Sequence, residues 1–198
     1  MLFRSLTVAV VTTVGLGGVL FYNMNIKNRY LNVDDINRDL AELEQRYARF
    51  IGLPQPTLTD VTLRVDLYPS RNAMQVAGTY RYVNATSAPI AALHIRTLPG
   101  AAPLRAVSVP GATLVHDDKK LNYHIFQFDQ PLQPGARGTM SFRTIIEKRG
   151  LAALPSDRQS YEGDAQPAGN GTYAVGQLFA PILEIGRASC RERVCLAV

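Results

Sequence analysis

The chain has 198 residues, of which 46% are hydrophobic and 19% charged, and these proportions exclude a disordered chain, a collagen or a coiled-coil rod. The formal net charge of +5 arises from 21 basic and 16 acidic residues that are spread along the sequence. So modest an excess does not indicate a nucleic-acid partner. The length allows one domain with an appendage, or two small domains.

Residues 1–26 are expected to form a transmembrane anchor. The stretch from Ser5 to Ile26 carries no charge, and as a helix it would extend ~33 Å, enough for a hydrocarbon core of about 30 Å. Tyr22 stands where an interfacial aromatic residue is expected. A cleavable secretory signal is the alternative, although no small-x-small cleavage site follows the apolar run. Either interpretation favours a location outside the cytoplasm for the rest of the chain, while the basic residues on both flanks of the apolar run leave its orientation open.

Residues 27–56 predict a short amphipathic helix and a linker. One stripe of apolar side chains recurs at helical spacing: Ile36, Leu40, Leu43, Tyr47 and Phe50. Gly52 and Pro54 end the helix, and Glu42 is placed to pair with Arg38 or Arg46 on the outer face. Two heptads are short for a coiled coil, so the stripe is expected to dock onto the neighbouring domain.

Residues 57–147 predict about seven short strands in an antiparallel β-sandwich or open saddle. Apolar and polar residues alternate over 61–67 and again over 74–82, and a turn is expected at 69–72. Leu93 and Ile95 lie on one face of a third strand, with His94 on the other. No crossover helix fits between the strands, which excludes a parallel α/β sheet. The fold class is therefore mainly β, preceded by one transmembrane and one amphipathic helix.

The remaining residues predict no regular structure. Residues 148–183 are expected to form a long loop that leads to a further domain. Residues 184–198 contain both cysteines, Cys190 and Cys195, and the run over 184–194 resembles the translation of a sequencing adapter. The alternative is a short basic tail, whose cysteine spacing fits no common zinc site.

Candidate chemistry is sparse. The three histidines, His94, His116 and His124, lie in predicted strands, and no metallopeptidase, serine-hydrolase or phosphate-binding motif occurs. His116 with Asp117 and Asp118 could be drawn as a metal trio, but a solvated hairpin tip is the favoured interpretation. Two tripeptides, beginning at residues 84 and 170, match glycosylation acceptors, and asparagine at turns explains both. The residues alone assign no catalytic or metal-ligating role.

The strand region resembles the opening sheet domain of the aminopeptidase N family of zinc metallopeptidases. The resemblance rests on the strand and turn at 60–69, on the run over 74–80 that contains Gly78, and on residues 84–94. Gly78 is expected to permit a close backbone approach within a long first hairpin. The membrane segment and the runs at 22–25, 47–56 and 170–173 are more similar to one branch, in which a bacterial ABC-type permease is fused to an extracytoplasmic aminopeptidase-like domain.

The resemblance implies a β domain beside the substrate cleft of a peptidase whose zinc and catalytic motifs match no position here. No catalytic or metal residue is therefore carried over, and zinc is implied only for the longer parent. Gln177 is the one candidate substrate-binding residue, because the run over 176–181 is expected to approach the family's substrate pocket. Plain loop packing is the alternative role for Gln177.

The sequence thus favours an N-terminal, non-catalytic fragment of a membrane-bound aminopeptidase-like zinc metallopeptidase, with or without fusion to an ABC-type permease. Its expected partners are the lipid bilayer, a following peptidase domain and the parent's peptide substrate, and no nucleic acid. The expected location is the bacterial inner membrane, with the β domain outside the cytoplasm. The alternatives are a tethered β-sandwich that binds a protein or glycan without catalysis, and a transporter accessory with a degenerate peptidase-like domain.

Overall fold

The fold comes from a computed structural model that describes residues 2–27, 33–98, 101–147, 166–168, 171–174 and 176–183. Residues 184–198 and Asn170 lie outside the described residues, and so do the predicted adapter-derived tail and the second glycosylation-type tripeptide. The helices and strands are α1 (Leu2–Phe21), a π-helical turn (Tyr22–Lys27), α2 (Val33–Tyr47), β1 (Thr57–Tyr68), β2 (Ala73–Val83), β3 (Ile90–Arg96), β4 (Leu104–Ser108), β5 (Ala112–Asp118), β6 (Tyr123–Leu132), β7 (Arg137–Glu147), β8 (Gln166–Ala168), β9 (Gly171–Tyr173) and α4 (Gly176–Phe179).

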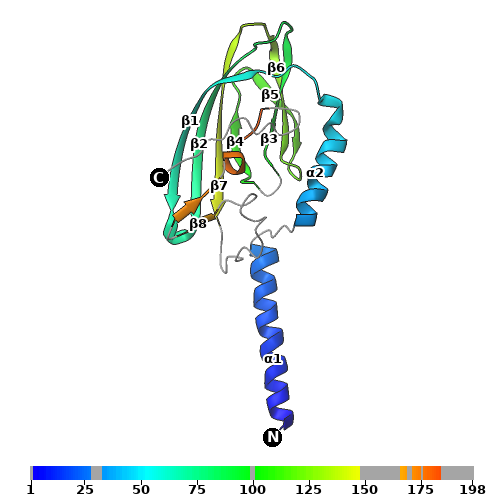
Figure 1. The fold of residues 1–198 in the computed structure, drawn as a ribbon, viewed down its shortest axis with the longest axis vertical. Helices are drawn as coiled ribbons and strands as arrows, with labels where there is room; N and C mark the ends of the chain where they lie inside the picture. Colours follow the sequence, from blue (N-terminus) through cyan, green and yellow to red (C-terminus); the bar gives the residue numbers. More distant parts are fainter. Residues whose placement is uncertain are drawn as a thin grey trace.

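Seven of these strands form two antiparallel sheets, which confirms the predicted fold class (Figure 1). Sheet A has the strand order β1-β2-β7-β4, and sheet B has the order β3-β6-β5. Alternate residues of each strand point between the sheets and form an inter-sheet core, whose members include Val76, Leu93, Ile95, Met140 and Phe142. Strands β8 and β9 pair separately as a short hairpin.

The first hairpin, β1–β2, has the turn that the sequence predicts, whereas the space at Gly78 is filled by side chains and not by a second backbone. A turn of 3₁₀-helix spans Pro69–Arg71, and Asn72 follows it in the left-handed region with φ of 48°. Gly78 lies opposite Leu63 on β1 and Phe142 on β7. A Cβ atom on Gly78 would collide with the Phe142 ring and come within 2.9 Å of Leu63 Cδ2. The missing side chain therefore makes room for the aromatic ring of Phe142.

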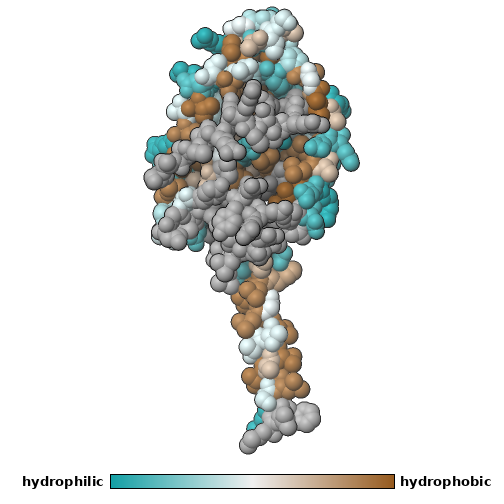
Figure 2. Space-filling model, in the orientation of Figure 1, coloured by the Kyte–Doolittle hydropathy of each residue, from teal (hydrophilic) through white to brown (hydrophobic). Residues whose placement is uncertain are grey.

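Helix α1 stands apart from the sandwich. It is exposed along its length, and an apolar span of 24 residues from Arg4 to Lys27 is long enough to cross a membrane. Figure 2 shows hydrophobic side chains along this helix. A signal sequence near the N-terminus would have the same length and composition, so these properties do not distinguish the two interpretations.

Helix α2 lies against the outer face of sheet B, as its apolar stripe predicts (Figure 1). Leu43 and Tyr47 are buried against Leu121 and Tyr123, in an outer cluster that is separate from the inter-sheet core. The Tyr47 and Tyr123 rings stack with their centroids 3.8 Å apart.

Residues 176–183, named here the closing segment, belong to the inter-sheet core although the sequence predicts a loop over 148–183. Leu178, Phe179 and Leu183 are buried in that core. The Thr144 hydroxyl of sheet A donates to the Phe179 carbonyl at 2.7 Å, and Ile182 forms an antiparallel bridge with Arg96 of sheet B. The closing segment is too short to show helical or strand periodicity, so the sequence pattern does not predict its burial. Its place in the core depends on contacts with residues far away in the chain.

Candidate functional site

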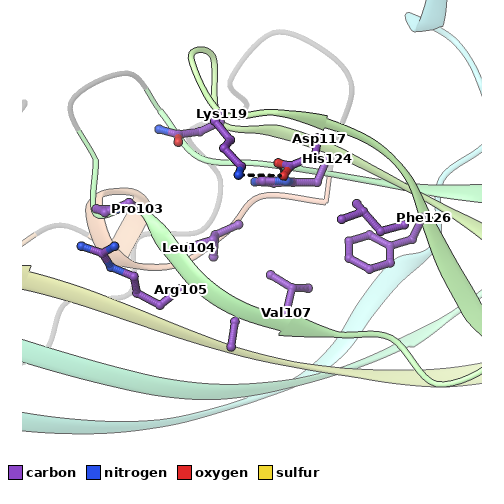
Figure 3. Close-up of a pocket in the computed structure, with 11 residues that line it drawn as sticks. Pro103, Leu104, Arg105, Val107, Asp117, Lys119, His124 and Phe126 are labelled. Carbon is purple, nitrogen blue, oxygen red and sulfur yellow. Dashed lines mark ion pairs between the residues drawn. The ribbon is translucent and has the colours of Figure 1, made fainter.

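A cavity of about 450 Å³ opens between the two sheets, at the edge where β4 and β5 lie (Figure 3). We name it the edge slot. Its apolar lining includes Leu104 and Val107 of β4, Leu114 of β5 and Phe126 of β6. Its polar lining consists of Arg105, Asp117, Lys119, Asn122 and His124. The edge slot thus combines an apolar wall with a charged end.

The charged end of the edge slot is organised around Asp117. This carboxylate lies 3.0 Å from His124 Nδ1 and 3.9 Å from the Lys119 ammonium. Strand register explains the histidine contact, because Asp117 and His124 are directly opposite each other on β5 and β6. Burial lowers the pKa of His124, and the nearby Asp117 only partly opposes this effect. The imidazole is therefore neutral at pH 7, with Nδ1–H donating to Asp117.

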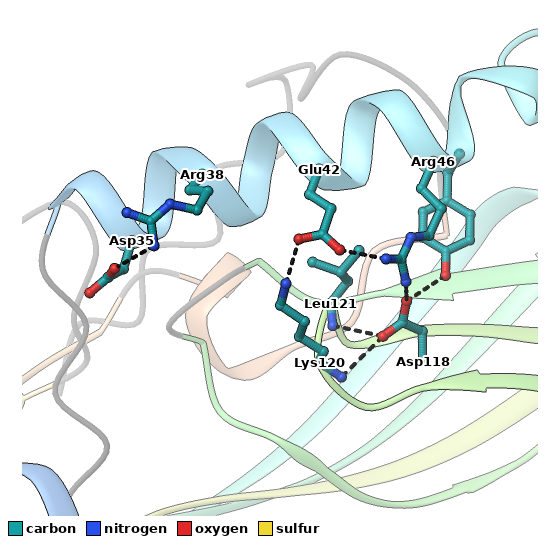
Figure 4. Close-up of polar contacts among 8 residues, drawn as sticks. Asp35, Arg38, Glu42, Arg46, Asp118, Lys120 and Leu121 are labelled. Carbon is teal, nitrogen blue, oxygen red and sulfur yellow. Dashed lines mark hydrogen bonds and ion pairs between the residues drawn. The ribbon is translucent and has the colours of Figure 1, made fainter.

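A second polar group lies on the opposite face of the same hairpin, where helix α2 meets it (Figure 4). We name this group the tip cluster, and its members are Glu42, Arg46, Tyr47, His116, Asp118 and Lys120. The Tyr47 hydroxyl donates to Asp118 at 2.8 Å and lies 2.9 Å from His116 Nε2. Arg46 donates to Asp118 at 2.9 Å.

Asp118 is the centre of the tip cluster. One of its carboxylate oxygens accepts from Tyr47 and Arg46, and the other accepts from the backbone N–H groups of Lys120 and Leu121, both at 3.1 Å. Burial by itself would raise the pKa of Asp118, but the hydrogen bonds from Leu121, Tyr47 and Arg46 lower it below its usual value. Burial and the Asp118 charge raise the pKa of Tyr47, so its hydroxyl stays protonated as a donor.

The sequence suggested two interpretations for His116, Asp117 and Asp118, a metal trio or a solvated tip. His116 and Asp118 both contact Tyr47, whereas Asp117 contacts His124 in the edge slot. The three side chains separate because neighbouring residues of a strand point to opposite faces. Within the described part of the chain, no group of three or more His, Cys, Asp or Glu side chains is placed to hold a metal ion. These residues do not fit a zinc site, and we derive no step of metal catalysis from them.

His94 contributes to the packing beneath helix α2. Its Nδ1 is 2.8 Å from the Tyr123 hydroxyl, and its ring contacts the Phe50 ring with the centroids 4.8 Å apart. The side chain is almost completely buried, and this burial lowers the pKa of His94 to about 4. His94 is consequently neutral near pH 7, and its contacts explain it as a structural residue.

Asn84, which begins a glycosylation-type tripeptide, has a structural role in a turn. Its side chain is fully buried, and its amide donates to the carbonyls of Ala88 and Leu132, both at 2.8 Å. Its carbonyl oxygen accepts from the backbone and hydroxyl of Thr86. The amide nitrogen uses both of its N–H groups for the two carbonyls, and a glycan would replace one of them, so the turn explains this asparagine.

Gln177, the one predicted substrate-binding residue, lies in α4 within the closing segment and is half-buried. Its neighbours Leu178 and Phe179 enter the inter-sheet core, and the Leu178 carbonyl accepts from the backbone of Ala102 at 2.7 Å. Gln177 does not line the edge slot, although Pro103, the residue after Ala102, does. Its expected contact with a substrate stays a prediction.

The fold and the edge slot define a protein of two antiparallel sheets with an exposed apolar helix at its N-terminus. No protein-family model matches the chain. No curated protein matches it. One similar solved structure is that of an M1 zinc metallopeptidase from Deinococcus radiodurans, with 15% sequence identity and a TM-score of 0.37. The alignment covers 53% of this chain and 23% of that protein, and at this similarity it assigns neither a family nor an activity to the chain.

Sequence reasoning missed the partners of Asp118 and His124. The tip cluster joins α2 to the β5–β6 hairpin, and Tyr47 and Asp118 are 71 positions apart in the sequence. The one signal in the sequence was the predicted apolar stripe that ends at Tyr47 and Phe50. It indicated that the helix docks onto the neighbouring domain, but not which surface of that domain it contacts. The Asp117–His124 pair follows from the β5–β6 register, which the hairpin prediction left open.

Proposed function

We propose that this chain is a non-catalytic, membrane-tethered β-sandwich module that belongs to an aminopeptidase-like zinc metallopeptidase fused to an ABC-type permease. The observation that supports a membrane tether is the order of the two N-terminal helices. The exposed apolar helix comes first, and the helix that packs against the sandwich follows it. Helix α1 ends at Phe21 and continues as the π-helical turn that ends at Lys27, and α2 begins at Val33 and lies against sheet B. A bilayer that holds α1 would therefore hold the sandwich close to its surface.

The proposed parent is supported by the sequence resemblance over residues 60–94 and by the long first hairpin in which Gly78 accommodates Phe142. In this proposal the zinc and the peptide hydrolysis belong to a following peptidase domain. Gln177 would contribute a polar group beside the substrate of that domain. The location is the bacterial inner membrane, with the sandwich outside the cytoplasm.

A stand-alone binding module is the second candidate function, and the edge slot is the observation that favours it. The slot offers an apolar wall beside charged groups, a combination that suits ligand binding. Such a module needs no catalytic partner.

Membrane flotation of the full chain tests the tether. We expect the chain to float with lipid vesicles, and the double substitution of Val11 and Val14 by lysine to prevent it, because each lysine at the centre of a span costs about 3 kcal/mol. The same double substitution at Thr79 and Thr139, which are exposed on sheet A, should leave flotation unchanged. Intact-mass measurement of the floated chain distinguishes an anchor, which keeps α1, from a cleaved signal. A chain that floats without α1, or with both lysines present, would contradict the tether.

An activity assay tests the non-catalytic role. The full chain, supplied with zinc and aminoacyl anilide substrates, is expected to show only background hydrolysis and less than one bound zinc per chain. Hydrolysis that depends on zinc and is lost with a chelator would refute the proposal that the module is non-catalytic.

A further inference from the structure

The edge slot lies between two strand edges that have no neighbour on the slot side among the residues that the structure describes. In the described part of the chain, β4 pairs only with β7, and β5 pairs only with β6. The backbone N–H and C=O groups along such edges are available to an added strand. An extended segment placed here would lie between sheet A and sheet B and would cover the opening (Figure 3).

The apolar wall of the edge slot is incompletely covered. Leu114 faces Phe126 across β5 and β6, and its side chain is still 44% exposed. Val107 lines the slot from the facing edge of sheet A. An apolar side chain inserted between these three residues would remove their exposed surface from water, which favours binding by about 25 cal/mol for each Å² buried.

The charges of the slot favour an anionic ligand. Arg105 and Lys119 supply two positive charges against the one carboxylate of Asp117. Asp117 already contacts His124 and Lys119, whereas Arg105 has no ion pair among the residues that the structure describes. The guanidinium group of Arg105 is therefore the cation most available to an incoming carboxylate.

We propose that the edge slot binds an extended peptide segment that carries one apolar and one acidic side chain. Arg105 and Val107 of β4 both line the slot. The register of β4 shifts between Leu104 and Ala106, where a bulge interrupts the alternation of its side chains. In the proposed complex the apolar side chain lies at Val107, Leu114 and Phe126, and the carboxylate lies at Arg105. This inference does not depend on the membrane tether or on a peptidase parent.

Fluorescence anisotropy with the full chain in detergent micelles tests this binding. The probe is a fluorescent blocked pentapeptide with valine at its second position, glutamate at its fourth and threonine elsewhere. We expect saturable binding that weakens as salt rises, because an exposed ion pair is screened. Replacing the peptide's glutamate by glutamine should weaken binding about five-fold, as expected for an exposed ion pair near 1 kcal/mol. Replacing its valine by threonine should weaken binding as well, because the apolar side chain is then lost.

Two variants of the protein locate the site. Arg105→Glu should weaken binding about five-fold or more, and Leu114→Ser should weaken it by removing part of the apolar wall. Arg143→Glu is the matched control, because Arg143 is an exposed arginine of sheet A outside the slot, and its effect should stay under about two-fold. Circular dichroism spectra of the variants should match that of the unsubstituted chain, since both arginines are exposed. Absence of binding, equal binding of the glutamine peptide, or an equal effect of Arg143→Glu would overturn the proposal.

Discussion

The two faces of sheet B are covered by layers of different chemistry. Sheet A covers the inner face, where Leu93 and Ile95 are completely buried among other apolar side chains. Helix α2 covers the outer face with a small apolar cluster and the polar tip cluster around Asp118. Burial of apolar surface does not titrate and is not weakened by charge screening, whereas ion pairs and titratable groups respond to both pH and salt. Changes of pH or ionic strength are therefore expected to detach α2 from sheet B and to leave the inter-sheet core intact.

The largest expected effect concerns the inner layer. Phe179→Ala removes a buried ring from the closing segment, and we expect the free energy of unfolding to fall by about 4 kcal/mol, as for other buried aromatic residues. Denaturant unfolding of the full chain in detergent measures this change. Leu53→Ala is the control, because Leu53 is 47% exposed and should cost under about 0.5 kcal/mol. Similar losses from both substitutions would mean that the closing segment is not part of the core.

The next effect concerns pH and the outer layer. The pKa of His94 is about 4 in the folded chain and about 6.5 in the unfolded chain, since burial disfavours its charged form. Between these values the unfolded chain binds a proton that the folded chain does not. The free energy of unfolding should therefore fall as the pH falls from about 6.5 to about 4, by up to about 3 kcal/mol.

Unfolding measured across this pH range with His94→Gln is the matching experiment. Glutamine can still form a hydrogen bond with the Tyr123 hydroxyl, as donor or acceptor, but does not titrate, so the pH dependence should become flatter. The low pKa of Asp118 places its own contribution below this range, where protonation would weaken the tip cluster further. An unchanged slope in the variant would assign the pH dependence to other groups.

The smallest effect should be confined to α2. Tyr47→Phe keeps the ring stacked on Tyr123 but removes the hydroxyl that donates to Asp118, which should cost about 1 kcal/mol. We expect faster amide hydrogen exchange in α2 and unchanged exchange in β2 and β7. Tyr68→Phe is the control, because Tyr68 lies under Arg71 and away from α2. If amide exchange in β2 rises as much as in α2, the two layers unfold together, and α2 is not a separately detachable layer.

The sequence alone could predict the elements whose pattern is local. Alternation over 61–67 and 74–82 predicted the long first hairpin, and the stripe ending at Phe50 predicted that α2 would dock. These predictions succeed because strand and helix periodicity is set by neighbouring residues. The sequence also predicts the length and the apolar character of α1, because neither property depends on a tertiary contact.

Only the tertiary structure decided where residues far apart in the chain meet. It placed Asp118 against Tyr47 of α2 and Asp117 in the edge slot, although the two carboxylates are adjacent in the sequence. It also brought the closing segment, Phe179 included, into a core whose other buried members lie between residues 57 and 147. These placements depend on the pairing of β5 with β6 and on the order of strands within each sheet. Strand order and register are collective properties of the packed chain, because many long-range contacts must form together, and no local pattern records them.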